Sequence, residues 1–310
     1  MVEVTSKSAA ICIMLMLLSG CGGDSASTSP PMEGVPPTTL PPTPPVPAPV
    51  VPFTFDGSFD VPAAAGFSFR QFSFVDSFGF NGIAYDQLRP LASPTVPRFI
   101  WSQPAQRLRL EYVGPATEYG STQIQQTGNY RIFKDESTRL VVGWDSPTRY
   151  VTLAAWSRLI GPVQRVGQAG NESQAFWALV GNQSTILSDL TSSLRYEGTA
   201  LTVPSDVQTG RLLFTAAPRL PGDNRVSGIL LLSATEGGVN VSRAALVFEG
   251  KFNIATNRFT GEITDATGGY TGTFEGAVFG PAREEVGISF NFSRSRDGGK
   301  VYAGVAIGAR

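Results

Sequence analysis

Glu284 and Glu285 are adjacent carboxylates and could be considered as a catalytic acid/base pair. Adjacent residues at the start of a strand point to opposite faces, so we expect the two carboxylates to act separately and Glu284 to lie in a solvated loop. The run Gly272–Gly276 has Phe at its centre and therefore contains no nucleophile elbow, and the sequence has no GxxxxGK[ST] phosphate-binding segment. None of the 310 residues is histidine, which excludes Ser-His-Asp and Cys-His relays, imidazole metal ligands and a histidine pH switch. We therefore expect no enzyme activity, no catalytic residue, no metal site and no cofactor.

Cys21 is the residue with the clearest chemical assignment. Lys7 precedes an apolar stretch from Ala9 to Leu18, which is shorter than the roughly 20 apolar residues that cross a bilayer and is typical of a secretory signal. The stretch ends in Leu18-Ser19-Gly20-Cys21, which resembles the lipobox of bacterial lipoproteins, and Gly22 rather than Asp follows it. The resemblance implies a signal peptide over residues 1–20, acylation of Cys21 (a palmitate-type lipid anchor) and transport to the outer membrane. The alternative is that Cys21 is only a small residue near an ordinary cleavage site.

Residues 21–52 are expected to form a disordered tether that carries the lipidated cysteine. This segment contains 11 of the 23 prolines and almost no charge, a composition that cannot bury a core and favours polyproline II. At about 3.1 Å per residue, such a spacer reaches roughly 90 Å from the acyl group. A long, stiff tether is typical of a protein body that must reach outward from a membrane.

Phenylalanine alternates with polar and small residues directly after the tether. Nine of the 20 phenylalanines fall between Phe53 and Phe80. Period-two patterning predicts half-buried strands, so we expect a sheet core here and keep a patch of exposed aromatic side chains as the alternative. The alternation is lost over residues 157–193, which predicts a loop-rich connector, and we place a β-rich domain over residues 53–192. Its further strands are predicted over Arg98–Trp101, Leu108–Val113, Tyr130–Phe133, Leu140–Trp144 and Tyr150–Trp156.

Residues 193–310 show the clearest strand pattern. Short turns rich in Gly, Asn, Asp and Pro separate the predicted strands, which favours antiparallel hairpins. Eight antiparallel strands leave no free edge if the sheet closes, and side chains just fill a barrel of that size. One face of the strands is persistently Thr, Ser, Glu and Arg, which favours a soluble barrel over one with an outward apolar membrane band. The eight strands are predicted over Leu194–Leu201, Arg211–Ala216, Arg225–Ala234, Ala244–Ile254, Arg258–Thr264, Tyr270–Val278, Val286–Phe292 and Lys300–Ile307.

The run from Gly276 to Phe290, GAVFGPAREEVGISF, is similar to the closing signature of the transferrin-binding protein B type barrel domain. The run from Arg195 to Ala200, RYEGTA, resembles the start of that family's first barrel strand. Two departures are Arg283, where the family usually has Ala, and Ile288, where it has a second Gly. The resemblance covers residues 150–310 and implies an all-β protein in which a handle-like domain (53–192) precedes an eight-stranded barrel (193–310). The signature residues, for which it implies a structural role, are Tyr196, Gly198, Gly276, Phe279, Gly280, Pro281, Glu284, Glu285, Gly287 and Phe290.

The function expected from these features is non-covalent binding. The 24 Lys and Arg nearly balance the 25 Asp and Glu, so the chain lacks the basic excess of a nucleic-acid-binding protein. The family resemblance implies a surface-exposed outer-membrane lipoprotein that binds an external protein or solute through barrel and handle loops, with a link to iron or nutrient acquisition. A surface-translocation barrel is a further expected partner. The alternative is a periplasm-facing structural or assembly lipoprotein without an external ligand. Which residues bind the ligand, and whether it is transferrin, a haem protein or another molecule, stay open.

Overall fold

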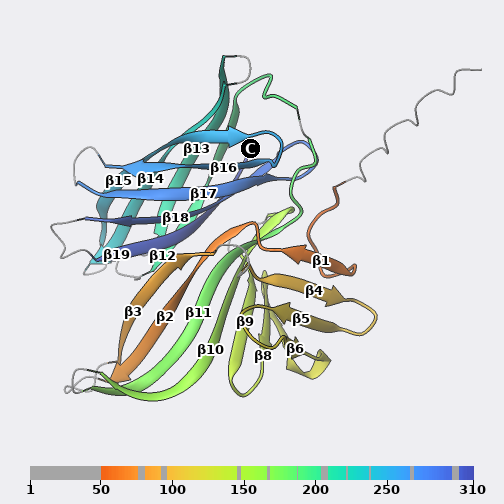
Figure 1. The fold of residues 1–310 in the computed structure, drawn as a ribbon, viewed down its shortest axis with the longest axis vertical. Helices are drawn as coiled ribbons and strands as arrows, with labels where there is room; N and C mark the ends of the chain where they lie inside the picture. The colour runs from red at the N-terminus through yellow and green to blue at the C-terminus, as the bar shows by residue number, and fades with distance from the viewer. Residues whose placement is uncertain are drawn as a thin grey trace, which may run out of the picture. The chain divides into compact units, whose positions relative to one another are not determined.

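Every described element longer than one turn is a β-strand (Figure 1). The computed structural model describes residues 50–75, 81–91, 96–144, 148–165, 168–186, 188–203, 209–220, 223–236, 239–265, 269–294 and 300–310. Residues 47–310 form one compact unit. No helix within these ranges is long and apolar enough to cross a membrane. The expected signal peptide, Cys21 and nearly all of the tether lie outside the described residues.

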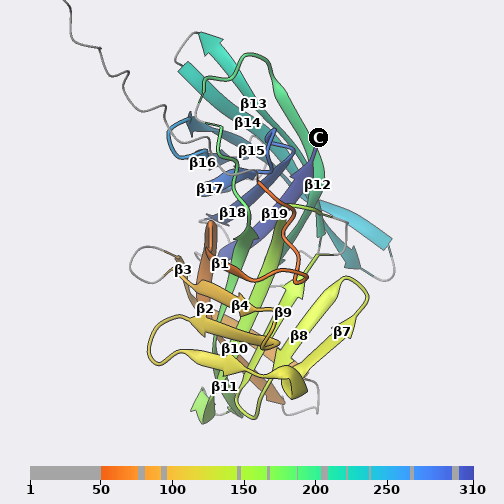
Figure 2. The same ribbon diagram turned by 90° about the vertical axis from the view of Figure 1, so that its right-hand side faces the viewer.

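The N-terminal β region contains eleven strands in two antiparallel sheets. The four-stranded sheet has the order β1-β4-β5-β6, and the seven-stranded sheet has the order β3-β2-β11-β10-β9-β8-β7. Figure 2 shows the small sheet lying over strands β10 and β11. The bounds are β1 Phe59–Pro62, β2 Ala65–Val75, β3 Asn81–Pro90, β4 Arg98–Ser102, β5 Arg107–Glu111, β6 Thr117–Tyr119, β7 Ile124–Thr127, β8 Tyr130–Lys134, β9 Thr138–Gly143, β10 Val151–Arg165 and β11 Gln168–Gly181, with one 3₁₀ turn at Ser121–Gln123.

The seven-stranded sheet is the middle layer of this unit. One face packs on the four-stranded sheet in a core that includes Trp101, Phe133 and Phe176. The opposite face packs on the barrel wall in a second core that includes Phe67, Phe69 and residues of the last barrel strand. The expected core is confirmed for Phe53, Phe55, Phe59, Phe67 and Phe69, which lie in or against these two cores, whereas Phe72 and Phe74 stack on each other outside them. Phe78 and Phe80 lie outside the described residues. The phenylalanines of β2 lie on both faces of the seven-stranded sheet. Phe67 and Phe69 face the barrel, whereas the ring of Phe72 lies against the guanidinium of Arg165 on the opposite face.

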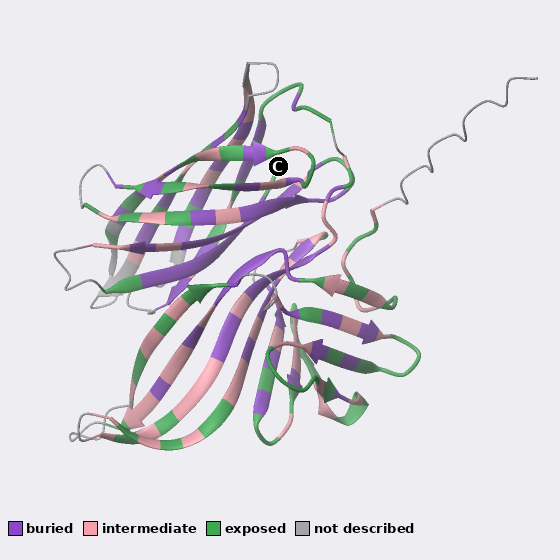
Figure 3. Ribbon diagram, viewed as in Figure 1, coloured by how far each residue is buried: buried purple, intermediate pink, exposed green. Residues whose placement is uncertain are grey.

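The connector predicted over residues 157–193 is wrong for its first two thirds. Strand β10 continues to Arg165, and strand β11 already begins at Gln168. The two strands pair over this whole length, up to the pair Arg165 and Gln168. The strand signal disappears because both faces of this outer half are partly exposed, so no apolar/polar alternation is needed (Figure 3). A register shift next to Gly161 and the presence of Pro162 added to the loop-like pattern. Pro162 is tolerated because β9 pairs with β10 only up to Arg158, which leaves the outer part of β10 with a neighbour on one side.

All eight strands predicted over residues 193–310 are confirmed, and they close into a barrel through pairing of the first with the last. Antiparallel neighbours follow the chain order throughout. Inward side chains such as Leu212, Phe248 and Phe290 fill the interior. Most outward positions that face solvent are polar, with Ile229, Leu231 and Val301 as exposed exceptions. The bounds are β12 Leu194–Val203, β13 Thr209–Leu220, β14 Asp223–Glu236, β15 Val239–Asn253, β16 Arg258–Thr264, β17 Thr271–Phe279, β18 Glu285–Ser293 and β19 Val301–Ala309.

Candidate functional site

The joint between the barrel and the N-terminal β region is built by four of the ten family-signature residues, Phe279, Gly280, Glu285 and Gly287. Glu285, at the start of β18, is 4% exposed, and its carboxylate accepts hydrogen bonds from the backbone N–H groups of Arg149, Tyr150 and Val151 at 2.6, 2.8 and 3.0 Å. The pair at 284 and 285 is thus no acid/base pair. The carboxylate of Glu284 instead accepts from the N–H of Ala282 within its own turn.

Two signature glycines allow the close approach at this joint. Gly280 has a φ of +86°, and a Cβ there would lie 2.7 Å from the ring of Tyr150. A Cβ on Gly287 would gain contacts of 3.1 Å with Leu179 and Phe279. Phe279 is buried in the core shared with the N-terminal β region and forms an isolated bridge with Gln183. These positions therefore determine how the two parts dock, and they are not exposed for ligand binding.

The remaining signature residues belong to the barrel itself. Gly276 and Gly198 lie where strands or rings approach closely, against Phe259 and Ile307 respectively. Phe290 lies in the barrel core, and the Tyr196 hydroxyl donates a 2.9 Å hydrogen bond to the Arg283 carbonyl. Burial strongly raises the pKa of Tyr196. Pro281 is the exposed member, in the turn before β18.

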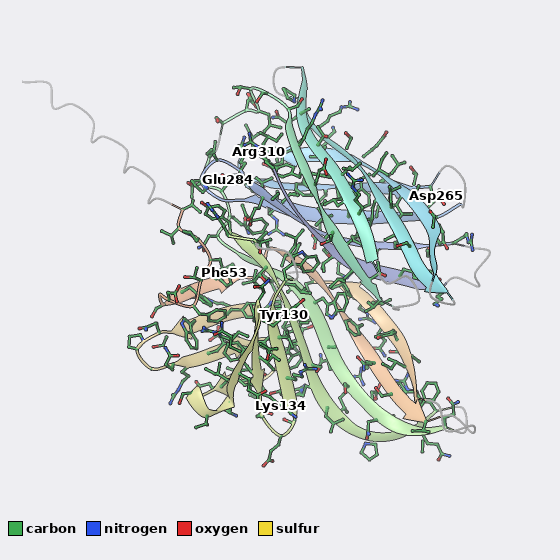
Figure 4. All side chains as sticks on the ribbon, turned by 180° about the vertical axis from the view of Figure 1, so that it is seen from behind. Phe53, Tyr130, Lys134, Asp265, Glu284 and Arg310 are labelled. Carbon is green, nitrogen blue, oxygen red and sulfur yellow. The ribbon has the colours of Figure 1, made fainter. Side chains whose placement is uncertain are left out.

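Arg283, the first departure from the family pattern, closes one end of the barrel. It is 4% exposed, and its guanidinium donates to the Asn257 side chain at 3.1 Å and to the carbonyls of Ile186 and Ser188, both at 2.9 Å. Asn257 donates to the carbonyls of Ser184 and Ile186 in turn. This buried network holds the segment that leads from β11 to β12. Figure 4 shows Glu284 and Arg310 together at this end of the barrel, with Asp265 at the other.

A second contact joins the barrel to the start of β2, at residues 64–66. Arg258 on β16 donates to the carbonyl of Ala64, and the carboxylate of Glu275 on β17 lies near the backbone N–H of Gly66. One oxygen of Glu275, Oε1, is buried without a hydrogen-bond partner. Burial raises the pKa of Glu275 above its usual range, and Arg258 offsets this only in part.

A cleft extends from this contact along β3, the edge strand of the seven-stranded sheet. Its inner hollow, of about 520 Å³, is lined by Leu88 and Pro90 on one side and by outward residues of β16 to β19, including Thr273 and Glu275, on the other. An outer hollow of about 550 Å³ follows β3 from Ile83 to Leu88 and meets Lys300 and Val301 of the barrel. The two hollows share Leu88 and Val301. Both parts of the unit therefore contribute walls to one concave surface, which is the usual form of a ligand site.

Three aromatic rings close the barrel core at the end beside the outer hollow, and two cationic side chains lie against them. The rings of Tyr270, Phe292 and Tyr302 pack together, with Phe292 and Tyr302 stacked at 5.1 Å between ring centroids. Arg294 lies 4.7 Å from the ring centre of Tyr270, and Lys300 lies 5.1 Å from that of Tyr302. Tyrosine and arginine are the residue types that dominate the energetics of protein–protein recognition.

Sequence reasoning did not identify these cleft residues. The one available signal in the cleft was Glu275, a carboxylate within a strand of Thr, Gly and aromatic residues. The position of β3 beside β19 brings together residues more than 200 positions apart, which no local pattern reveals. No group of three or more Cys, Asp or Glu residues within the described ranges is arranged to hold a metal ion.

Comparison with known proteins gives distant structural matches. No protein-family model matches the chain, and no curated protein matches it. Transferrin binding protein B from serogroup B Neisseria meningitidis aligns at 14% identity with a TM-score of 0.39, covering 77% of this chain and 48% of that chain, about half its length. A mutant of transferrin binding protein B from Haemophilus parasuis aligns at 12% identity with a TM-score of 0.32, covering 81% and 77%. A protein of unknown function from Nostoc punctiforme aligns at 12% identity with a TM-score of 0.25, covering 78% and 95%. Values in this range establish neither a shared family nor a shared function.

Proposed function

We propose that this protein is an outer-membrane lipoprotein that binds an external protein or solute non-covalently, with the cleft along β3 as its ligand site. The observation that carries the proposal is that the walls of this cleft come from both the N-terminal β region and the barrel. Concave surfaces at such junctions are preferred ligand sites. The cationic side chains of Arg294 and Lys300, which lie against buried or half-buried rings at the adjoining barrel end, add charged anchors suited to a macromolecular ligand.

Support for display at the cell surface comes from the sequence. The lipobox-like run that ends at Cys21 supplies an anchor, and the Pro-rich tether supplies reach. The signature between Gly276 and Phe290 resembles that of surface-displayed binding lipoproteins, and it supports the same role. A surface-translocation barrel is then the expected partner in export. The role proposed is binding without catalysis.

Protease treatment of intact cells tests the display. We expect an external protease to remove residues 53–310 from intact cells, with a periplasmic protein as the control for membrane integrity. A body that stays intact until the outer membrane is broken contradicts surface display and favours the periplasm-facing alternative. Capture from serum and from spent medium by the purified chain, followed by mass spectrometry, then identifies the ligand.

A further inference from the structure

We propose that a second pocket, in the N-terminal β region, binds a small monocarboxylate with an apolar body, and that Arg131 holds its carboxylate. The pocket has a volume of about 380 Å³ and lies between the segment 53–56, which precedes β1, and the strands β7 to β9. It shares no lining residue with either hollow of the cleft along β3. The site therefore does not depend on the function proposed above.

Arg131 is placed on β8 with its guanidinium against aromatic rings. Its Cζ lies 4.3 Å from the ring centre of Phe55 and 5.6 Å from that of Trp101, and these two rings are nearly perpendicular, at 80°. Aromatic contacts occupy the face of a guanidinium and leave its N–H edge available, and that edge is the part that matches a carboxylate in a two-point hydrogen bond.

The N–H edge of Arg131 has no acceptor among the described residues, since its recorded interactions are with the two rings and, at longer range, with Asp56. Partial burial of the guanidinium lowers the pKa of Arg131, and the more distant charge of Asp56 offsets this only in part. A partly desolvated guanidinium without an acceptor is costly, and a bound oxyanion would remove that cost.

Other donors border the same pocket. The indole N–H of Trp144 has no hydrogen-bond partner, although the residue is only 4% exposed. Gln126 lies opposite Arg131 in the β7–β8 pairing and adds an amide, and Thr152 adds a hydroxyl. Phe53 and Phe55 form an apolar wall. Figure 4 shows Phe53 and Tyr130, two residues that line the pocket.

Charge limits the ligand to a single negative group. Asp56 lines the pocket and acts on Arg131 through space, beyond ion-pair distance, so that one negative charge already faces the site. A dianion such as phosphate would be repelled, whereas a monocarboxylate presents one charge and two coplanar acceptors. The aromatic wall favours an apolar group beyond the carboxylate.

Isothermal titration of the purified chain carrying Cys21→Ser tests the site with three probes. We expect 3-phenylpropionate to bind with one-to-one stoichiometry, and phenethylamine and inorganic phosphate to bind at least about tenfold more weakly. Arg131→Gln is expected to weaken 3-phenylpropionate by at least about tenfold, the order of a charge-assisted hydrogen bond. Arg139→Gln, which changes an exposed arginine on neighbouring β9, is expected to leave the affinity unchanged.

Thermal unfolding of each variant shows whether it is folded. If Arg131→Gln does not fold, Trp144→Phe decides, because it keeps the wall and removes only the indole N–H; a threefold or larger loss of affinity supports the site. The proposal is overturned if the parent protein binds no 3-phenylpropionate at millimolar concentration, if the amine binds as well as the acid, or if the folded variants bind like the parent.

Discussion

Glu284 and Glu285 are neighbours in the sequence and differ completely in environment. Glu285 is buried and accepts three backbone N–H groups that lie about 135 residues earlier in the chain, whereas Glu284 satisfies its own turn. Strand geometry predicted that the two would point apart. Strand geometry could not predict the partners of Glu285, because a hydrogen bond between two distant β structures does not change the local pattern of apolar and polar residues.

The change Glu285→Gln is expected to lower the free energy of unfolding by about 2–3 kcal/mol, because an amide presents one acceptor oxygen and turns its NH₂ toward a backbone donor. Glu284→Gln is the matched control and is expected to change stability by less than about 0.5 kcal/mol, as for ordinary surface substitutions. Urea unfolding of both variants measures the difference. Equal effects would show that Glu285 does not hold the joint.

Glu275 gives stability a pH dependence of defined sign. Burial raises its pKa in the folded state, so the folded protein holds this proton more tightly than the unfolded chain. The stability it contributes is therefore fully present below the unfolded pKa of about 4.3 and is lost as pH rises through the folded pKa. The nearby charges are Arg258, Glu262 and Arg89. Arg89 lies opposite Ser68 in the pairing of β2 with β3, on the other face from Phe67.

We expect Glu275→Gln to remove this decline in unfolding free energy as pH rises above the unfolded pKa of about 4.3. Glu262→Gln, which changes the exposed carboxylate in the same cleft, should retain it. Chemical denaturation at a series of pH values gives both profiles. A profile of Glu275→Gln that follows that of the parent would show that Glu275 does not titrate in this range.

Individual strands were predictable wherever one face is buried and the other solvated. Most barrel strands meet that condition, whereas β18 and β19 are buried on both faces where the barrel packs on the seven-stranded sheet. The sequence pattern located all eight strands within a few residues. The outer halves of β10 and β11 do not meet that condition, since their two faces are about equally exposed. Their pairing with each other, and of β11 with β2, is a tertiary feature that period-two patterning does not encode.

The segment between β11 and β12 is held largely by side-chain hydrogen bonds, and Arg283 donates two of them, to the carbonyls of Ile186 and Ser188. Arg283→Ala is expected to lower the free energy of unfolding by about 2–3 kcal/mol, because it removes charged donors from buried carbonyls. It should also speed amide hydrogen exchange over residues 182–190. Arg310→Ala, which removes one exposed contact with the Ala282 carbonyl, serves as the control. If amide hydrogen exchange over this segment is the same in Arg283→Ala as in the parent, then Arg283 does not hold the segment.

The molecule as a whole combines a barrel with a sheet that is covered on both faces. The sequence predicted an all-β chain with a barrel at its C-terminal end, and the fold confirms this. It did not predict that the seven-stranded sheet packs on the barrel with one face and on a four-stranded sheet with the other. The extents of the handle-like and barrel domains, and the lipid anchor, remain predictions. The cleft along β3 exists only because this sheet and the barrel meet, so a site of this kind could not be read from either part alone.

The most direct test of the binding proposal is to fill the cleft and measure affinity for the captured ligand. Thr273 and Thr271 are both exposed on β17, and only Thr273 lines the inner hollow. Surface plasmon resonance with the ligand isolated from serum or spent medium should show that Thr273→Trp binds at least about tenfold more weakly than the parent, because the indole occupies ligand space. Thr271→Trp should bind like the parent. Undiminished binding by a correctly folded Thr273→Trp variant would contradict the assignment of the cleft as the ligand site.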